Sequence, residues 1–446
     1  MVRVPAASDP IAVVGLGFGD EGKGSIVDAL ARRRNIAAVV RFNGGPQAAH
    51  HVVTPEGQVH CFSQIGSALL ADPNLPSLST HRVLVEPLGL LREADVLSRL
   101  VSGDPLSRLH LDARSVVVTP FHRLMNRAIE VARGQGRHGS CGLGVGQAYQ
   151  DSLRSSLPTV RLGDLRDPAR LRRKLEVIRW SKIDWIEELQ RENTSVELER
   201  LRAEMRRPDL IPATLHGYAE LLHRVNLHDE VLPPRGAVLL EGAQGTLLDE
   251  NYGFWPHVTP STTTFAWADE ISSEPPYRLG VLRAFSTRHG AGPLVAEGAP
   301  EVLLQGEHNK HNDWQGSFRV GWFDLVMARY ALAVVGGVDG LALTCLDRLR
   351  ELPWVGLVDA WMFSGDPTEA ADLFNLDGQR VLGVLVAHPP CRVRQERLTR
   401  MLSQCKPLLR RLPSTHALLD TLQQALETPV VVRSWGATAE AKEVLL

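Results

Sequence analysis

Short apolar runs rich in β-branched residues alternate along the chain with longer amphipathic stretches. The apolar runs predict β-strands at residues 11–14, 37–42, 83–85, 116–118, 237–240, 280–285, 341–344, 381–386 and 430–432. Strands that are apolar at nearly every position are typical of a parallel sheet whose two faces are both covered by helices. We therefore predict an α/β fold built on one large, mostly parallel β-sheet flanked by helices.

Two amphipathic stretches rich in Arg, Glu and Leu predict helical insertions at the periphery, at about residues 165–207, with a break at Pro168, and 392–426. The sequence shows no internal repeat and no low-complexity linker between these stretches and the predicted strands. We therefore expect residues 1–446 to form a single large domain rather than separable modules.

Composition narrows the class of protein. The 446 residues carry a net charge of −2, so binding to nucleic acid or to a membrane by bulk charge is not expected. The five cysteines form no C-x-x-C pair, which argues against a disulfide framework or a zinc knuckle and favours a reducing, cytoplasmic location. No signal-peptide core is visible near the start, and no apolar run is long enough to predict a membrane span.

The strongest chemical signal is the glycine-rich segment GLGFGDEGKGS at residues 15–25. It lies between a predicted strand and a predicted helix at 26–34, the arrangement in which backbone N–H groups at a helix start bind phosphate. Gly24 stands where a Walker A loop has Ser or Thr, and Asp20 lies inside the loop. Because a carboxylate repels phosphate, Asp20 is predicted to be a metal ligand, a base, or both.

Further loops follow the predicted strands, where open α/β sheets place ligands. The segment NGGPQAAHH at residues 43–51 contains His50, which could donate a proton to a phosphoryl oxygen. The glycine loop at 138–149 contains Ser140 and Cys141, and EGAQG at 241–245 presents the amide of Gln244.

Later in the chain, Arg288 and Arg319 could bind a carboxylate or phosphate. Asp347 directly follows a predicted strand in LTCLD, at the position of a guanine-reading carboxylate in G-proteins.

In this order and spacing, GDEGKG, EGAQGTLLD and TRHGAGP resemble the adenylosuccinate synthetase family over about residues 11–434. The resemblance implies a P-loop-like fold, a homodimer, and a GTP- and Mg²⁺-dependent ligase that joins aspartate to C6 of inosine monophosphate (IMP). It makes Asp20 the catalytic base and, with the carbonyl of Ala49, a magnesium ligand, and it makes His50 the catalytic acid.

The resemblance also implies two sets of binding residues. The phosphates and base of GTP would be bound by Gly19, Glu21, Gly22, Lys23, Gly24, Asp347, Ser434 and Gly436. The purine nucleotide and the amino acid would be bound by Gln47, Ser140, Cys141, Arg154, Gln244, Thr259, Arg288 and Arg319, with Arg154 a candidate to enter a partner's site.

Several positions depart from the family pattern. Gln47 replaces an Asn that binds the nucleotide, Cys141 replaces a phosphate-binding Thr, and Cys345 replaces a Lys that packs on the donor base. In the amino-acid loop at 313–319, Arg319 is what remains of an arginine cluster. These changes leave open a paralogue with another amine donor, a deoxy or 2-aminopurine nucleotide, or ATP in place of GTP.

Two other classes of function are weighed against the ligase. A non-catalytic purine-nucleotide-binding protein would have no need of Asp20 and His50. An NAD-dependent oxidoreductase fits the glycine spacing, but Arg41 and Asn43 stand where a ribose-binding acid is expected.

Overall fold

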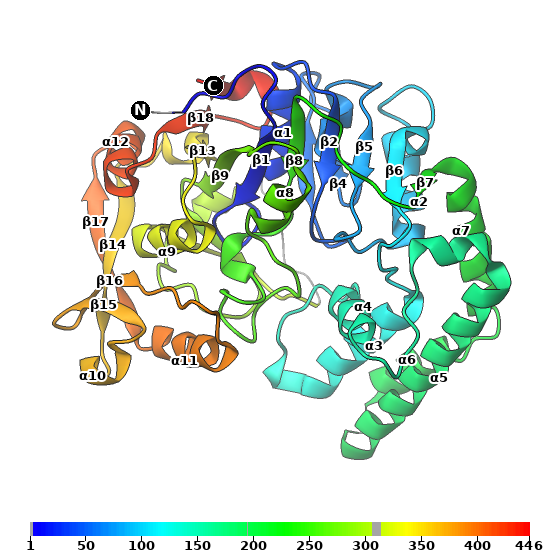
Figure 1. Cartoon of the computed structure of the whole chain (residues 1–446). Helices are drawn as coiled ribbons and strands as arrows, with labels where there is room; N and C mark the ends of the chain where they lie inside the picture. The colour runs from blue at the N-terminus through cyan, green and yellow to red at the C-terminus, as the bar shows by residue number, and fades with distance from the viewer. Residues whose placement is uncertain (1–2, 194, 306–313) are drawn as a thin grey trace.

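A twisted, mostly parallel sheet lies at the centre of the computed structural model, which describes residues 3–193, 195–305 and 314–446 (Figure 1). Within these residues the sheet has ten strands, in the order β19 (Lys442–Val444), β18 (Val430–Ser434), β13 (Gly340–Thr344), β9 (Tyr277–Arg283), β1 (Ile11–Gly15), β8 (Val238–Glu241), β2 (Ala38–Arg41), β5 (Ser77–Ser79), β6 (Leu109–Asp112) and β7 (Asn226–His228). Every neighbouring pair is parallel except β18 and β19. The predicted fold class is confirmed.

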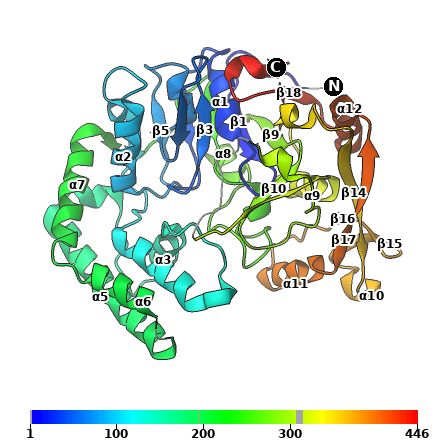
Figure 2. The same cartoon turned by 180° about the vertical axis from the view of Figure 1, so that it is seen from behind.

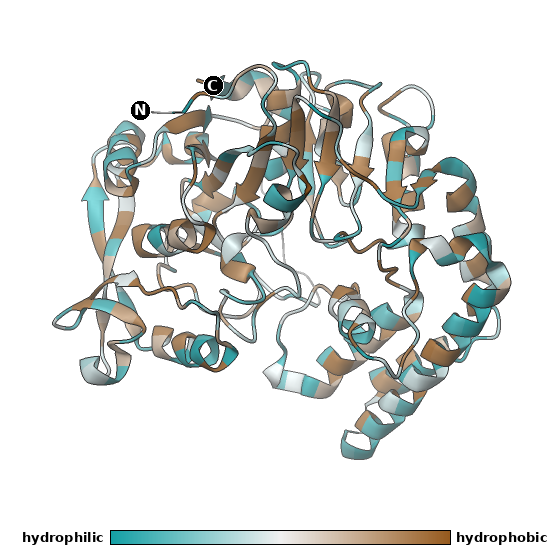
Figure 3. Cartoon of the chain, viewed as in Figure 1, coloured by the Kyte–Doolittle hydropathy of each residue, from teal (hydrophilic) through white to brown (hydrophobic). Residues whose placement is uncertain are grey.

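Both faces of the sheet are covered, as the apolar strands predicted. In β1, Ile11 and Val13 belong to the core cluster that includes α1 (Lys23–Ala31), whereas Ala12 and Val14 belong to the cluster that includes α9 (Leu325–Val335). Successive side chains of a strand point to opposite faces, so one apolar strand fills two cores. Figure 3 shows the apolar residues concentrated in these central strands.

A helical insertion extends from one end of the sheet and comprises α2 (Pro87–Leu97), α3 (Pro120–Arg133), α4 (Val145–Ser152), α5 (Pro168–Glu192), α6 (Val196–Met205) and α7 (Leu210–Arg224). The helix-rich prediction for 165–207 is therefore confirmed. Pro168 begins α5 instead of interrupting a helix, because proline suits the first helical turn and the Asp167 carboxylate accepts from the N–H of Arg170 at 3.0 Å. No described helix is long and apolar enough to span a membrane.

A second, smaller sheet lies at the other end of the molecule, and Figure 2 shows it and the helical insertion on opposite sides of the main sheet. It contains β12 (Phe323–Asp324), β14 (Val355–Phe363), β15 (Phe374–Asp377), β16 (Arg380–Val384) and β17 (Cys405–Leu412), with helices α10 (Pro367–Ala370), α11 (Arg392–Leu402) and α12 (Thr415–Leu426) beside it. The strand predicted at 381–386 is thus β16, in this sheet, and β17 interrupts the stretch predicted as helical at 392–426.

Two predicted strands are wrong. Residues 83–85 and 116–118 form only isolated bridges, including one between Val85 and Val117, because α2 begins at Pro87 and α3 at Pro120. Strands β5, β6 and β7 were not predicted, since each has at most four residues and carries polar side chains.

The remaining elements place loops at the edge of the main sheet. They are the hairpin β3 (His50–Val53) with β4 (Val59–Phe62), the pair β10 (Ser286–His289) with β11 (Phe318–Gly321), and α8 (Ala266–Ile271). Because the parallel strands share one direction, the segments that follow β1, β2, β8, β13 and β18 meet at one edge.

Candidate active site

A cavity of about 830 Å³ opens at this edge of the main sheet. Its wall includes Asp20 after β1, Gln47 after β2, Gln244 after β8, Asp347 after β13 and Ser434, the last residue of β18. Residues as far apart in the sequence as Phe18 and Ala437 therefore face one space. The predicted convergence at the carboxyl ends of the strands is what the structure shows.

The side chain of Glu21 holds the glycine-rich loop in its conformation. Its carboxylate accepts hydrogen bonds from the N–H groups of Gly17 at 3.0 Å and Gly19 at 2.8 Å, and it pairs with the Lys23 ammonium at 2.6 Å. Both side chains of the pair are buried, which strengthens the interaction. Lys23 still reaches the cavity wall, together with Gly19 and Gly22.

Gly24 allows α1 to approach β3 closely. A Cβ atom added at Gly24 would lie 2.6 Å from the Cβ of His50 and 3.0 Å from the Oγ of Ser67. The glycine at the Walker Ser/Thr position thus makes room for His50 beside the loop.

Three non-glycine residues on the cavity wall have left-handed backbone conformations: Asp20 (φ 60°), Gln244 (φ 61°) and Cys345 (φ 59°). Glu427, the other such residue in the described chain, ends α12. Such conformations are strained for non-glycine residues and concentrate at functional sites. Asp20 and Gln244 are two of the residues predicted to act on the substrate.

His50 is held by a buried carboxylate. Its Nδ1 lies 2.5 Å from Oε1 of Glu241, and Glu241 also accepts from the N–H of Ser67 at 2.9 Å and from the Ser67 hydroxyl. Burial lowers the pKa of His50 to about 4, against the opposing effect of Glu241. The neighbouring Arg41 and His50 hold the pKa of Glu241 at about 2 in spite of its burial. Glu241 therefore stays ionised and fixes the imidazole so that Nδ1 carries a proton.

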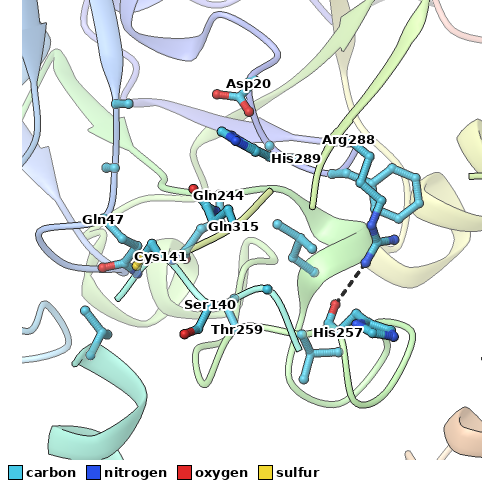
Figure 4. A pocket seen from close by; sticks show the side chains of 18 of the residues that line it. Asp20, Gln47, Ser140, Cys141, Gln244, His257, Thr259, Arg288, His289 and Gln315 are labelled. Atoms are coloured by element: carbon cyan, nitrogen blue, oxygen red, sulfur yellow. Dashed lines mark hydrogen bonds between the residues drawn. The ribbon is translucent and has the colours of Figure 1, made fainter. Parts of the chain in front are cut away.

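A group of buried amides lines the opposite part of the cavity. Both side-chain polar atoms of Gln47 and of Gln244, and Oε1 of Gln147, have no hydrogen-bond partner within the described residues. Figure 4 shows Gln47, Gln244 and Gln315 around the same opening. Because an unpaired buried polar group costs about 1–3 kcal/mol, this group is arranged for a polar ligand.

Ser140 and Cys141 also line the cavity, below the amides in Figure 4. Asn126 of α3 donates to the Ser140 hydroxyl at 2.9 Å and accepts from the N–H of Gly144. Burial raises the pKa of the Cys141 thiol, which makes it a weak nucleophile. Thr259 lies on the same wall.

The two predicted carboxylate-binding arginines both hold the turn at residues 290–293. Arg288 donates to the carbonyls of Ala291, Pro293 and His257, the last of which is marked in Figure 4. Its guanidinium lies 4.2 Å from the centre of the Phe18 ring. Arg319 donates to the carbonyls of Gly290 and Gly292 and pairs with Glu297. Burial lowers the pKa of Arg288 to about 9.

At the far end of the cavity, Asp347 follows β13, Ser434 ends β18, and Gly436 lies in the turn after it. The Ser434 hydroxyl donates to the carbonyl of Gly436 at 3.1 Å. Behind this turn, the ammonium of Lys442 donates to the carbonyls of Gly436, Ala437 and Thr438.

Most of the predicted site residues meet in this cavity. Its lining contains Gly19, Asp20, Gly22, Lys23, Gln47, Ala49, His50, Ser140, Cys141, Gln244, Thr259, Arg288, Asp347, Ser434 and Gly436. Glu21, Gly24, Arg154 and Arg319 lie outside the lining formed by the described residues. Arg154 is exposed, with its guanidinium 5.6 Å from the ring centre of Trp185. Asp313 of the predicted amino-acid loop lies outside the described residues.

The sequence interpretation missed several residues of the site. Glu241 opens the EGAQG motif, so its place at the end of an apolar strand was a usable signal. Gln147, His289 and Gln315 also line the cavity, but isolated Gln and His residues in loops carry no distinctive pattern.

The cavity wall offers oxygen ligands for a cation, although the described residues contain no cluster of acidic side chains. No group of three or more His, Cys, Asp or Glu side chains suited to a metal occurs in the described part of the chain. The Asp20 carboxylate and the Ala49 backbone lie on the same cavity wall. One carboxylate and one carbonyl, completed by phosphate oxygens, match the ligands that Mg²⁺ takes in nucleotide sites.

Comparison with protein families gives one match over nearly the whole chain. The model described as adenylosuccinate synthetase matches residues 12–441. The chain is 32% identical to the adenylosuccinate synthetase of Synechococcus sp. (strain WH7803), covering 96% of this chain and 95% of that protein. It is also 32% identical to the enzyme of the same name from Nostoc punctiforme, covering 96% and 93%.

Solved structures share the fold. The fully ligated adenylosuccinate synthetase from Plasmodium falciparum superposes with a TM-score of 0.73 at 20% identity, covering 98% of this chain and 99% of that one. The cyanophage S-2L succinoaminodeoxyadenylate synthetase, bound to dGMP and to dATP as an energy donor, superposes with a TM-score of 0.57 at 17% identity, covering 99% and 96%.

Proposed function

The chain belongs to the adenylosuccinate synthetase family, and we propose that it is a GTP- and Mg²⁺-dependent carbon–nitrogen ligase that forms adenylosuccinate from IMP and aspartate. The observation that carries the proposal is the meeting of Asp20, His50, Gln244 and Asp347, from four separate segments of the chain, in one cavity. A family relationship over nearly the whole chain supports the same reaction class.

The acceptor purine lies against the amide-lined wall. Gln244 reads the oxo and N–H groups of the ring, and Gln47, Ser140, Cys141 and Thr259 bind its phosphate and sugar. Asp20 removes the proton from N1, so that the 6-oxygen attacks the γ-phosphate of GTP. Positioning of this kind supplies most of the catalysis in phosphoryl transfer.

The donor nucleotide extends from the glycine-rich loop to the turn after β18. Lys23, with N–H groups of residues 20–24, neutralises the phosphates, and Glu21 holds the loop in shape by accepting from Gly17 and Gly19. Once protonated, His50 donates from Nε2 to the transferring phosphoryl group on the side opposite Glu241, and the negative charges of that group and of Glu241 favour the protonated form. Asp20 and the Ala49 carbonyl would hold Mg²⁺, which neutralises phosphate charge when bound.

The amine then displaces phosphate from C6. Arg288 and Arg319 hold the turn at residues 290–293 in place by donating to its carbonyls. We propose that this turn binds the carboxylates of aspartate. In a homodimer, the exposed Arg154 would complete the partner's nucleotide site.

A coupled assay of phosphate release tests the proposal. Purified protein receives Mg²⁺, GTP or ATP, one of IMP, dIMP, GMP and dGMP, and one amino acid from a panel. We expect turnover with GTP, IMP and aspartate, and a product whose mass equals that of adenylosuccinate. Turnover confined to another amine or to a deoxy or 2-amino nucleotide would replace the proposal by the changed-substrate paralogue. Tight nucleotide binding without turnover in any combination would replace it by a binding protein.

A further inference from the structure

Lys442 is buried behind the turn that forms the base end of the cavity. Its side chain is 3% exposed, and its ammonium donates to the carbonyls of Gly436 at 3.2 Å, Ala437 at 3.1 Å and Thr438 at 2.8 Å. An ammonium has three protons and no acceptor, so three carbonyls satisfy it completely. Lys442 does not itself line the cavity, whereas Gly436 and Ala437 do.

This arrangement fixes the directions in which the C=O and N–H groups of the turn point. In a trans peptide the C=O and the following N–H point in opposite directions. Three carbonyls drawn toward Lys442 therefore turn the N–H groups of the same peptides away from it. Because Gly436 and Ala437 separate Lys442 from the cavity, the N–H groups of their peptides face the side on which a bound base lies, whereas Thr438 is bridged to Val53 of β3.

The turn and the phosphate loop are both attached to α1. Arg33, just after α1, donates to the carbonyls of Ala439 at 2.8 Å and Lys442 at 3.0 Å. Asp28, within α1, attracts the Lys442 ammonium. The first residue of the same helix is Lys23, on the cavity wall. The helix thus holds the two ends of the donor site at a fixed separation.

We propose that Lys442 is a positioning and specificity-determining residue, which presents backbone N–H donors to the base of the donor nucleotide and thereby selects a 6-oxopurine over a 6-aminopurine. Guanine offers an oxygen acceptor at C6, which N–H donors satisfy, whereas adenine offers an amino group there. The inference rests on the proposed function only in treating this end of the cavity as the donor's base site.

The charge of Lys442 is open to titration. Burial lowers its pKa to about 8, although Asp28, Cys345 and Asp347 act to raise it, and Arg33 adds to the lowering. Glu440 lies near enough to Asp28 to raise the pKa of that carboxyl as well. Loss of one proton removes the charge and leaves two N–H donors for three carbonyls, which loosens the turn.

The test measures the dissociation constants of GDP and ADP by calorimetry for wild-type protein, Lys442→Met and Lys442→Arg. Lys406→Met is the control, because the Lys406 side chain is exposed on β17. We expect Lys442→Met to weaken GDP at least about tenfold and ADP less than about twofold, with IMP affinity and the KM for aspartate unchanged. We expect Lys442→Arg to restore most of the preference for GDP. Equal GDP affinity in folded Lys442→Met, or wild-type protein that prefers ADP, would overturn the inference.

A pH series on wild-type protein decides the matter even if Lys442→Met does not fold. A group with a pKa of about 8 loses about six-sevenths of its charged fraction between about pH 7 and about pH 8.8, so the GDP:ADP affinity ratio should fall by up to about sevenfold. Arg stays charged over this range, so Lys442→Arg should show a flat ratio. A flat wild-type ratio would contradict the inference. Because only nucleotide binding is measured, failure of the synthetase assay would leave this result interpretable.

Discussion

The two ends of the cavity differ in how their polar groups are satisfied. At the donor end, charged groups have partners within the protein: Lys23 pairs with Glu21, His50 with Glu241, and Lys442 with three carbonyls. At the acceptor end, Gln47 and Gln244 have no partner within the described residues.

The difference separates preorganisation from recognition. The donor end binds a highly charged triphosphate, and internal pairs hold its charges in place before the ligand arrives. The acceptor end reads a neutral ring edge, for which unpartnered amides give the largest penalty against a wrong base. Altering the charged groups around the phosphates should therefore reduce kcat, and altering the acceptor end should raise the KM for the acceptor nucleotide.

The largest effect is expected at Asp20. Asn tolerates the left-handed conformation that Asp20 adopts (φ 60°), so Asp20→Asn removes the base while keeping the loop. We expect kcat to fall by about 10³-fold or more, with GDP affinity within a few-fold of wild type. The exposed Asp377→Asn on β15 is the matched control. A variant with full rate would show that Asp20 is not the base.

The next effect is expected at Glu241. Removing a charge-assisted partner costs about 1.5–3 kcal/mol, so Glu241→Gln should lower kcat about 10–100-fold. Burial lowers the pKa of His50, and the Glu241 carboxylate opposes this by raising it. Its loss therefore lowers that pKa further, and the basic limb of the kcat–pH profile should move to lower pH. An unchanged profile would mean that His50 is not the titrating acid.

At the acceptor end, Gln244→Asn shortens the side chain by one methylene group. Asn tolerates the left-handed backbone conformation that Gln244 adopts (φ 61°), so the loop should keep its shape. The variant should raise the KM for IMP about tenfold through the loss of hydrogen bonds worth about 0.5–1.5 kcal/mol each. The KM for GTP should change little. If both constants rise together, the two ends of the cavity are not independent.

The smallest effect is expected at Arg319, which lies outside the lining but holds the turn at 290–293. Arg319→Gln should raise the KM for aspartate about three- to tenfold by loosening this turn, with the nucleotide constants unchanged. Arg172→Gln, on the exposed face of α5, provides the control. A change in the KM for IMP alone would assign the turn to the nucleotide instead.

Much of this site could be predicted from the sequence because its residues lie in short loops after apolar strands. Asp20, Gln244 and Asp347 were predicted from that position, and the structure places all three in the cavity. Glu241 and Lys442 were not predicted as site residues. Glu241 contacts His50, which lies 191 residues away in the sequence, and Lys442 contacts carbonyls four to six residues before it. Both contacts form only when the chain is folded.

By itself, the sequence determined the α/β class, the parallel main sheet and the edge at which the loops meet, since these follow from apolar periodicity and glycine placement. Only the tertiary structure decided which charges are paired. It showed that Arg288 and Arg319 donate to backbone carbonyls, that Glu21 accepts from the N–H groups of the glycine-rich loop, and that Lys442 donates to the carbonyls of the last turn. The physical reason is that periodicity reports which face of an element is buried, whereas the partner of a buried charge depends on distances between elements that no local pattern encodes.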